Sequence, residues 1–100
     1  MTTFMVAKSS EVKPGQMKSF KVDGHAILIA NWQGTYFATQ DLCTHDDGVL
    51  GDGELVNGEI ECPRHGARFD LQTGRGTLPA ILPIKTFPVQ IVGDDIQIAL

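Results

Sequence analysis

The chain has 100 residues and a formal net charge of −4, from 12 acidic and 8 basic side chains. This length predicts one domain with a modest hydrophobic core. The acidic balance argues against a nucleic-acid partner, because phosphate binding needs a basic surface. No apolar stretch approaches the roughly 18 residues of a membrane span, and the first residues lack the charged and apolar segments of a signal peptide. We therefore expect a soluble, cytoplasmic protein without a membrane partner.

The sequence predicts β-strands throughout, because its apolar residues form short runs bounded by glycine and proline and show no helical period of convincing length. Asp23-Gly24 and Asn57-Gly58 are predicted hairpin turns, and Pro14-Gly15 marks another turn. Further turns are expected at 31–34, 73–74 and 93–95. The expected strands span residues 4–7, 18–22, 25–30, 35–39, 59–62, 69–71, 86–92 and 96–100. The predicted fold class is all-β.

Two short motifs contain nearly all the cysteines and histidines of the chain. Cys43-Thr44-His45 and Cys62-Pro63-Arg64-His65 are separated by sixteen residues and use both cysteines and two of the three histidines. In an extended segment residues i and i+2 point the same way, so the ends of the first motif can face one target. Pro63 favours a tight turn that brings the ends of the second motif together. Each motif thus offers one thiolate and one imidazole.

Three kinds of site compete for these ligands. A zinc site accepts two cysteines and two histidines, although zinc fingers usually pair like with like along the sequence. A Cys43–Cys62 disulfide would leave both histidines without a role, and nothing in the sequence indicates an oxidising compartment. A Rieske [2Fe–2S] centre has two cysteines on one iron and two histidines on the other. The pattern of one of each per motif favours the third kind, and the other two remain open.

Cys43-x-His45 followed by Cys62-x-x-His65-Gly66 resembles the motif of the Rieske family. The segment 62–70 is similar to the second cluster-binding loop of that family, and the resemblance covers the chain from Phe4 to Leu100. It implies one antiparallel Rieske domain over residues 1–100. In this fold a barrel- or sandwich-like base carries an inserted cluster-binding subdomain, here at about residues 40–83.

The resemblance also implies the ligands and the partners. Cys43 and Cys62 would hold the inner iron of one [2Fe–2S] cluster per chain, and His45 and His65 the outer iron through Nδ1. The length and form are similar to the Rieske ferredoxins of bacterial ring-hydroxylating dioxygenases. That implies a one-electron carrier, not an enzyme, between a flavin-containing NAD(P)H-dependent ferredoxin reductase and a terminal Rieske non-haem iron oxygenase. The alternative is the small Rieske-like subunit of an NAD(P)H nitrite reductase.

The sequence departs from the quinol-oxidising branch of the family. That branch has an additional cysteine in each loop, where this chain has Arg64 and the residues around Asp47. It also has a serine and a tyrosine, which donate hydrogen bonds to the cluster, where this chain has Ala67 and Phe69. These two side chains have no donor, and reduction makes a neutral cluster negative. We therefore expect a potential at the low end of the class range of about −150 to +300 mV.

Charge is unevenly distributed around the motifs. Six acidic residues and no basic residue lie between them, whereas residues 64–75 contain three arginines and one aspartate. This is typical of a solvated surface on which arginines offset nearby acids. The alternative is a polarised face that orients the carrier on its redox partners.

Several other residues have simpler interpretations. Residues 76–83 resemble the proline-containing loop that covers the cluster in the family, although an ordinary crossover explains them equally well. His25 directly follows a turn and is expected to be a solvated loop residue, and Trp32 is expected to be a packed or half-exposed structural side chain. A catalytic role for Asp46 and Asp47 is disfavoured, because no substrate pocket is evident beside them.

Overall fold

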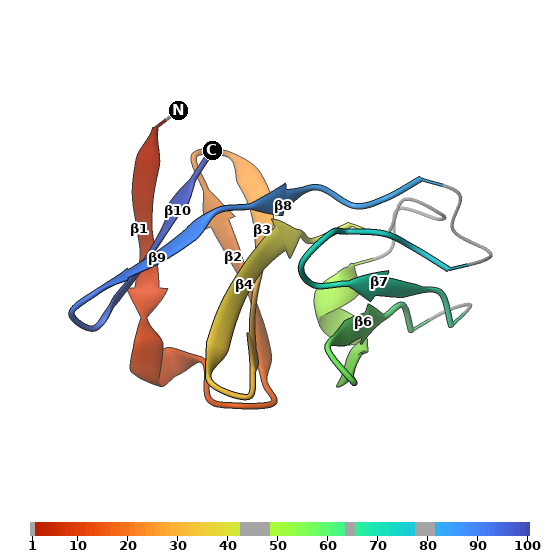
Figure 1. The fold of residues 1–100 in the computed structure, drawn as a ribbon. Helices are drawn as coiled ribbons and strands as arrows, with labels where there is room; N and C mark the ends of the chain where they lie inside the picture. Colours follow the sequence, from red (N-terminus) through yellow and green to blue (C-terminus); the bar gives the residue numbers. More distant parts are fainter. Residues whose placement is uncertain (1, 43–48, 64–65, 78–81) are drawn as a thin grey trace.

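The computed structural model describes residues 2–42, 49–63, 66–77 and 82–100 (Figure 1). Among these residues there is no α-helix, and the regular structure consists of antiparallel strands and two short 3₁₀ turns, η1 (Ser9–Glu11) and η2 (Leu50–Asp52). Within the described ranges no helix is long and apolar enough to cross a membrane. The all-β prediction is confirmed.

The strands form three antiparallel sheets. The first has the order β1 (Thr3–Lys8), β10 (Asp95–Ala99), β9 (Val89–Val92). The second has the order β2 (Met17–Val22), β3 (His25–Trp32), β4 (Thr35–Gln40), β8 (Thr86–Phe87). The third has the order β5 (Glu54–Val56), β6 (Glu59–Glu61), β7 (Arg68–Asp70). In Figure 1 the first two sheets form the base on the left, and the third lies on the right.

Strand β3 is central to the packing because both of its faces are buried. Ile27 and Ile29 lie in the core of the base, together with apolar side chains from β1, β2, β4 and β10. Leu28 and Ala30 point to the opposite side and pack in a second core with side chains of the third sheet. Burial of both faces explains why this segment is a continuous apolar run and does not alternate with polar residues.

Three two-residue turns have positive φ at both central positions, as type I′ hairpins require. They are Asp23-Gly24, Gln33-Gly34 and Asn57-Gly58. The first and third confirm predicted turns. The second corrects the predicted turn at 31–34, because Asn31 belongs to β3. Asn31 is buried in this strand, where its amide donates to the carbonyl of Val12 (3.0 Å) and accepts the N–H of Gly34 (2.9 Å).

The prediction of one strand over 86–92 is wrong, because Pro88 divides this segment into β8 and β9. Proline has no N–H for a ladder hydrogen bond. Strand β8 pairs with β4 in the second sheet, and β9 pairs with β10 in the first. Pro88 is therefore where the chain passes from one sheet to the other. The other predicted strands agree with the structure within two residues, whereas β5 was not predicted.

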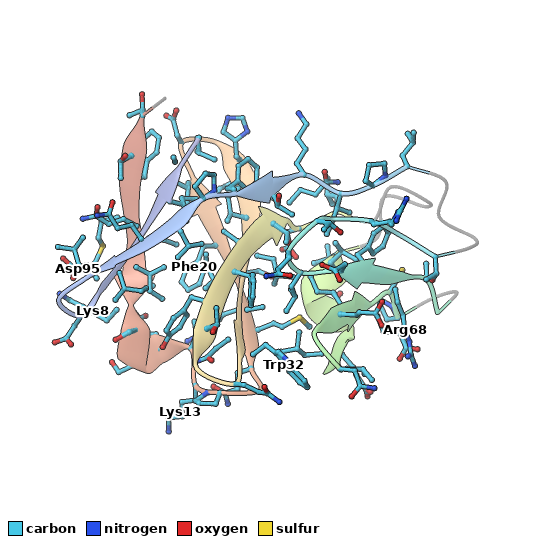
Figure 2. The ribbon with its side chains drawn as sticks, viewed as in Figure 1. Lys8, Lys13, Phe20, Trp32, Arg68 and Asp95 are labelled. Atoms are coloured by element: carbon cyan, nitrogen blue, oxygen red, sulfur yellow. The ribbon has the colours of Figure 1, made fainter. Side chains whose placement is uncertain are left out.

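Trp32 joins the base to the third sheet. Its side chain packs against the core that contains the third sheet, and a Cβ added to Gly58 would lie 3.4 Å from its Nε1 atom. In Figure 2 Trp32 points from the base toward the side of the molecule that holds the third sheet. This confirms its structural interpretation. His25 is exposed, as expected, and it is the first residue of β3, directly after the Asp23-Gly24 turn.

Candidate metal centre

Of the four predicted ligands, the structure describes Cys62, which directly follows β6. Its side chain is 1% exposed and its thiol is free, which does not fit the disulfide alternative. The described residues taken alone contain no group of three or more His, Cys, Asp or Glu that could hold a metal ion. The other predicted residues lie outside the described ranges: Cys43, His45, His65, Asp46 and Asp47.

Cys62 begins a tight loop between β6 and β7. Its N–H donates to the carbonyl of Ala67 (2.7 Å), and its own carbonyl accepts the N–H of Gly66 (3.2 Å). Gly66 has a φ of +73°, a left-handed conformation that glycine adopts without steric cost. These two hydrogen bonds close the loop that contains the second motif.

The described residues on the two sides of the first motif, up to Leu42 and from Val49 onward, lie next to each other. Leu42 pairs with Val49 in an antiparallel bridge. The N–H of Leu50 donates to the carbonyl of Asp41 (3.0 Å), and the N–H of Asp41 donates to the carbonyl of Ala26 (3.1 Å). Since Ala26 belongs to β3, the chain that enters residues 43–48 is fastened to this strand, and the chain that leaves them is fastened to Asp41 and Leu42.

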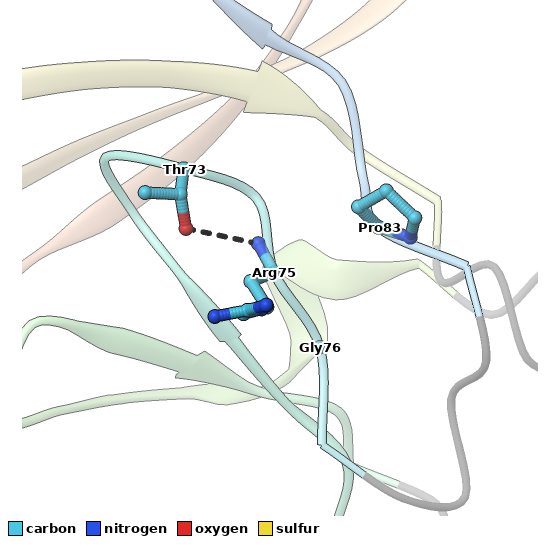
Figure 3. Close-up of a pocket in the computed structure, with 4 residues that line it drawn as sticks. All are labelled: Thr73, Arg75, Gly76 and Pro83. Atoms are coloured by element: carbon cyan, nitrogen blue, oxygen red, sulfur yellow. Dashed lines mark hydrogen bonds between the residues drawn. The ribbon is translucent and has the colours of Figure 1, made fainter.

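The predicted covering loop, 76–83, is described only at its ends (Figure 3). The N–H of Ile84 donates to the carbonyl of Gly74 (2.9 Å), so the chain after the loop lies against the turn that precedes it. Figure 3 shows the N–H of Arg75 donating to the hydroxyl of Thr73 (3.2 Å) inside this turn. A pocket of about 490 Å³ lies between this turn and Pro83. The covering role itself stays a prediction, because residues 78–81 lie outside the described ranges.

The described surroundings of Cys62 fit a sulfur ligand that is kept from water. Cys62, Ala67 and Phe69 are 0–1% exposed and belong to one apolar core with Leu50 and Ile60. An apolar shell of this kind controls solvent access to a metal centre and its potential. Together with a donor set of two thiolates and two imidazoles, this environment is compatible with an iron–sulfur cluster bound through Cys62.

The outer face of the third sheet is acidic. Its inward side chains are apolar, so the residues that alternate with them face outward. Glu54 lies opposite Glu61, and Glu59 lies opposite Asp70, although like charges directly opposite each other destabilise a sheet. Arg68 forms an ion pair with Glu61 (3.4 Å), which supports the interpretation of offset charges at that one point. The two like-charge pairs favour a polarised face.

A hollow of about 380 Å³ lies at the border of this face. It is lined by Asp52, Gly53, Glu54, Glu61, Cys62, Pro63 and Gly66.

Comparison with known proteins identifies the family. The family model of the Rieske [2Fe-2S] domain matches residues 2–88, a range that contains both motifs. The chain belongs to the Rieske [2Fe–2S] family. Membership identifies this Rieske chain as an iron–sulfur protein, so the zinc alternative is not supported.

Curated relatives of this Rieske protein are ferredoxin components. The ferredoxin component of biphenyl 2,3-dioxygenase from Rhodococcus jostii (strain RHA1) is 39% identical over 101 residues, which covers 100% of this chain and 94% of the relative. The ferredoxin component of a naphthalene 1,2-dioxygenase system from Pseudomonas aeruginosa is 40% identical over 91 residues, or 90% of this chain and 88% of the relative. The Rieske protein is accordingly an electron-carrying component and not a catalytic enzyme itself.

Solved structures share the fold of this Rieske protein. The ferredoxin of carbazole 1,9a-dioxygenase from Nocardioides aromaticivorans IC177 is 35% identical with a TM-score of 0.93, covering 99% of this chain and 98% of that one. A chain in the complex of reduced oxygenase and oxidized ferredoxin in carbazole 1,9a-dioxygenase is 28% identical, with a TM-score of 0.89 over 97% and 92% of the two chains. A putative NADH-dependent nitrite reductase small subunit from Mycobacterium tuberculosis has a TM-score of 0.88 over 97% and 93%, but only 14% identity. That likeness concerns the fold alone, so the nitrite-reductase alternative has no further support.

Asp41 lies beside the first motif but is not among the residues that the sequence pattern indicates. Its side chain is 5% exposed, and its Oδ1 accepts the N–H of Gly51 (2.9 Å). Like Asp46 and Asp47, it is one of several acidic residues near the first motif. The one available signal was its position directly after a strand and two residues before Cys43.

Proposed function

We propose that this chain carries one electron at a time on one [2Fe–2S] cluster per chain. Cys43 and Cys62 would hold one iron, and His45 and His65 the other. The observation that carries the proposal is the family match across both motifs, together with the burial of Cys62 in an apolar core. A bound cluster supplies a site that accepts and releases a single electron. The described residues around Cys62 contribute by excluding water from the cysteine side.

Electrons would enter from a flavin-containing reductase and leave to a terminal Rieske non-haem iron oxygenase. NAD(P)H transfers two electrons as a hydride to the flavin, which passes them on singly, so two carrier molecules are reduced for each NAD(P)H oxidised. The names of the relatives and the solved oxygenase–ferredoxin complex support an oxygenase as the acceptor. We place these encounters in the cytoplasm and expect a small interface of less than about 1,200 Å².

The first experiment combines electron paramagnetic resonance of the dithionite-reduced protein with iron and zinc assays on the same sample. We expect a rhombic signal with average g of about 1.9 and roughly two irons per chain, because nitrogen ligands on one iron distinguish this cluster from all-cysteine clusters. One zinc per chain without a signal would refute the proposal.

A substitution tests the ligand assignment. Cys62→Ser should lose the cluster or change its spectrum, because the thiolate would be replaced by a poor iron ligand. Ala67→Ser is the matched control, since it adds a hydroxyl beside Cys62 and leaves all four predicted ligands in place. An unchanged spectrum and iron content in Cys62→Ser would show that the assignment is wrong.

The partner assignment needs its own measurement. The reduced protein is mixed in a stopped-flow instrument with oxidised terminal oxygenase of a biphenyl dioxygenase system, and its reoxidation is followed optically. Rapid reoxidation under anaerobic conditions is expected. A stable complex with a large haem- and flavin-containing subunit during purification would instead favour the nitrite-reductase alternative.

A further inference from the structure

Asp41 is a buried carboxylate that the proposed ligand set does not use. Three buried polar or charged residues are found in the described part of the chain, Asn31, Thr39 and Asp41, and Asp41 is the charged one among them. It is 5% exposed. A charge withdrawn from water in this way is costly unless hydrogen bonds compensate it.

The position of Asp41 is fixed by three hydrogen bonds. Its backbone N–H donates to Ala26 (3.1 Å), and its backbone carbonyl accepts from Leu50 (3.0 Å). Its Oδ1 accepts the N–H of Gly51 (2.9 Å). The side chain is thus held between the central strand β3 and the turn η2, where residues 43–48 leave and re-enter the described structure.

The fit around this carboxylate is close. A Cβ added to Gly51 would lie 3.2 Å from Oδ1 of Asp41 and would collide with Oγ of Ser19. Glycine at this position therefore lets the backbone of η2 approach the carboxylate. Within the described ranges Asp41 has no ion-pair partner, since the two ion pairs found there join Lys8 to Asp95 and Arg68 to Glu61.

Chain connectivity places this charge near the first motif. Asp41 precedes the predicted ligand Cys43 by two residues, and two residues of fully extended chain span at most about 7 Å between Cα atoms. We propose that Asp41 is a positioning residue with an electrostatic role. Its carboxylate binds the chain that follows the first motif to the chain that precedes it, and its negative charge opposes reduction of the cluster. This inference rests on the proposed function, because it takes Cys43 as a ligand.

The physical argument concerns charge. Two ferric ions, two sulfides, two thiolates and two neutral imidazoles sum to zero, and the added electron makes the cluster negative. A fixed carboxylate would change such an equilibrium on the order of tenfold if it lay about 10 Å from the cluster, in surroundings with an effective dielectric constant of about 20. A tenfold change corresponds to about 59 mV for one electron. This effect is separate from the missing donors at Ala67 and Phe69.

The test is a redox titration of the cluster-loaded full chain and of three variants, each with its iron content and melting temperature. Asp41→Asn keeps an acceptor for Gly51 but removes the charge. Asp41→Ala removes both. Asp94→Asn is the matched control, because Asp94 is exposed in the turn between β9 and β10, at the end of the molecule opposite the third sheet (Figure 1).

Asp41→Asn and Asp41→Ala should both shift the reduction equilibrium toward the reduced form, on the order of tenfold. Only Asp41→Ala should also lower the melting temperature and the iron content, since it alone loses the hydrogen bond to Gly51. Asp94→Asn should leave the potential unchanged. An Asp41→Asn protein with full iron content and the potential of the unmodified chain would overturn the inference.

A second variant covers the case in which Asp41→Asn does not retain iron. Ser19 is exposed on β2 and its Oγ lies beside Gly51, whose N–H binds the Asp41 carboxylate, so Ser19→Lys adds a positive charge on this side of Asp41 without changing Asp41 itself. The potential should rise in Ser19→Lys and stay constant in Ser19→Asn. If neither changes it, the charge at this position does not act on the cluster. A chain without a rhombic signal would instead refute the proposed function itself.

Discussion

Ala67 and Phe69 share one core with Cys62, so their chemistry would bear directly on the potential of a cluster bound through Cys62. Both are fully buried, and the carbonyl of Ala67 accepts the N–H of Cys62. Neither side chain has a hydrogen-bond donor. A donor stabilises the more negative state of a cluster, so its absence lowers the potential.

We predict that Ala67→Ser with Phe69→Tyr raises the midpoint potential. Preferential stabilisation of the reduced state by about 1 kcal/mol per donor corresponds to roughly 40 mV each for one electron. The measurement is a redox titration, with Phe20→Tyr in the base as the control (Figure 2). A double variant with an unchanged or lower potential would contradict the donor argument.

Among the elements, the turn after β7 and the segment that precedes β8 are joined by a close backbone contact. Gly74 has a φ of +78°, and a Cβ at this position would collide with the carbonyl of Ile84. The same two residues are joined by a hydrogen bond of 2.9 Å. This contact holds the two ends of residues 75–83 together, so it depends on glycine for both conformation and space.

Gly74→Ala should therefore destabilise the protein more than Gly24→Ala. Gly24 has a similar φ of +81° but nothing within 4 Å of an added Cβ, so its variant bears only the conformational cost of about 1–3 kcal/mol. The additional collision at Gly74 should lower the melting temperature further, by roughly 4–8 °C for each 1 kcal/mol. Equal melting temperatures for the two variants would show that the chain after the loop can move away freely.

At the scale of the whole molecule, the two hydrophobic cores depend differently on the cluster. The core of the base contains no predicted ligand, whereas Cys62 belongs to the core shared with the third sheet. Metal binding contributes directly to the folding of the segments that supply its ligands. The base should consequently be the more autonomous part of the protein.

Removal of iron by a chelator under reducing conditions should lower the melting temperature and loosen the third sheet before the base. Hydrogen exchange measured by mass spectrometry should become faster in residues 49–63 and 66–77 while β1–β4 retain most of their protection. Uniform loss of protection over both parts would mean that the molecule unfolds as a single cooperative unit without its metal.

The acidic outer face of the third sheet should influence partner binding. Like-charge pairs such as Glu54–Glu61 persist across its strands despite their cost, and the whole chain is negative. Electrostatic attraction to a basic partner is screened beyond about 10 Å at 0.1 M salt. The rate of electron transfer to the oxygenase should fall several-fold as salt is raised, and Glu54→Gln should weaken this dependence. Asp94→Asn, at the opposite end, serves as the control.

Local chemistry made several features predictable from the sequence. The turns at Asp23-Gly24 and Asn57-Gly58 depend on residues that tolerate positive φ, so two neighbours suffice to indicate them. The two Cys/His motifs indicate a mixed-ligand cluster because ligand type and spacing are properties of short segments. The alternation and clustering of apolar residues likewise identified an all-β chain.

Other features required contacts between distant segments. The tertiary structure alone showed that Pro88 separates two strands of different sheets, because strand partners are not encoded in the segment itself. It also showed that Asp41 is a buried charge and that Gly74 meets the carbonyl of Ile84. Each of these depends on which residues, remote in sequence, occupy the neighbouring space. The sequence determined which ligands are available and where strands and turns form. Packing decided that Asp41 is buried near the first motif and that position 74 must be glycine.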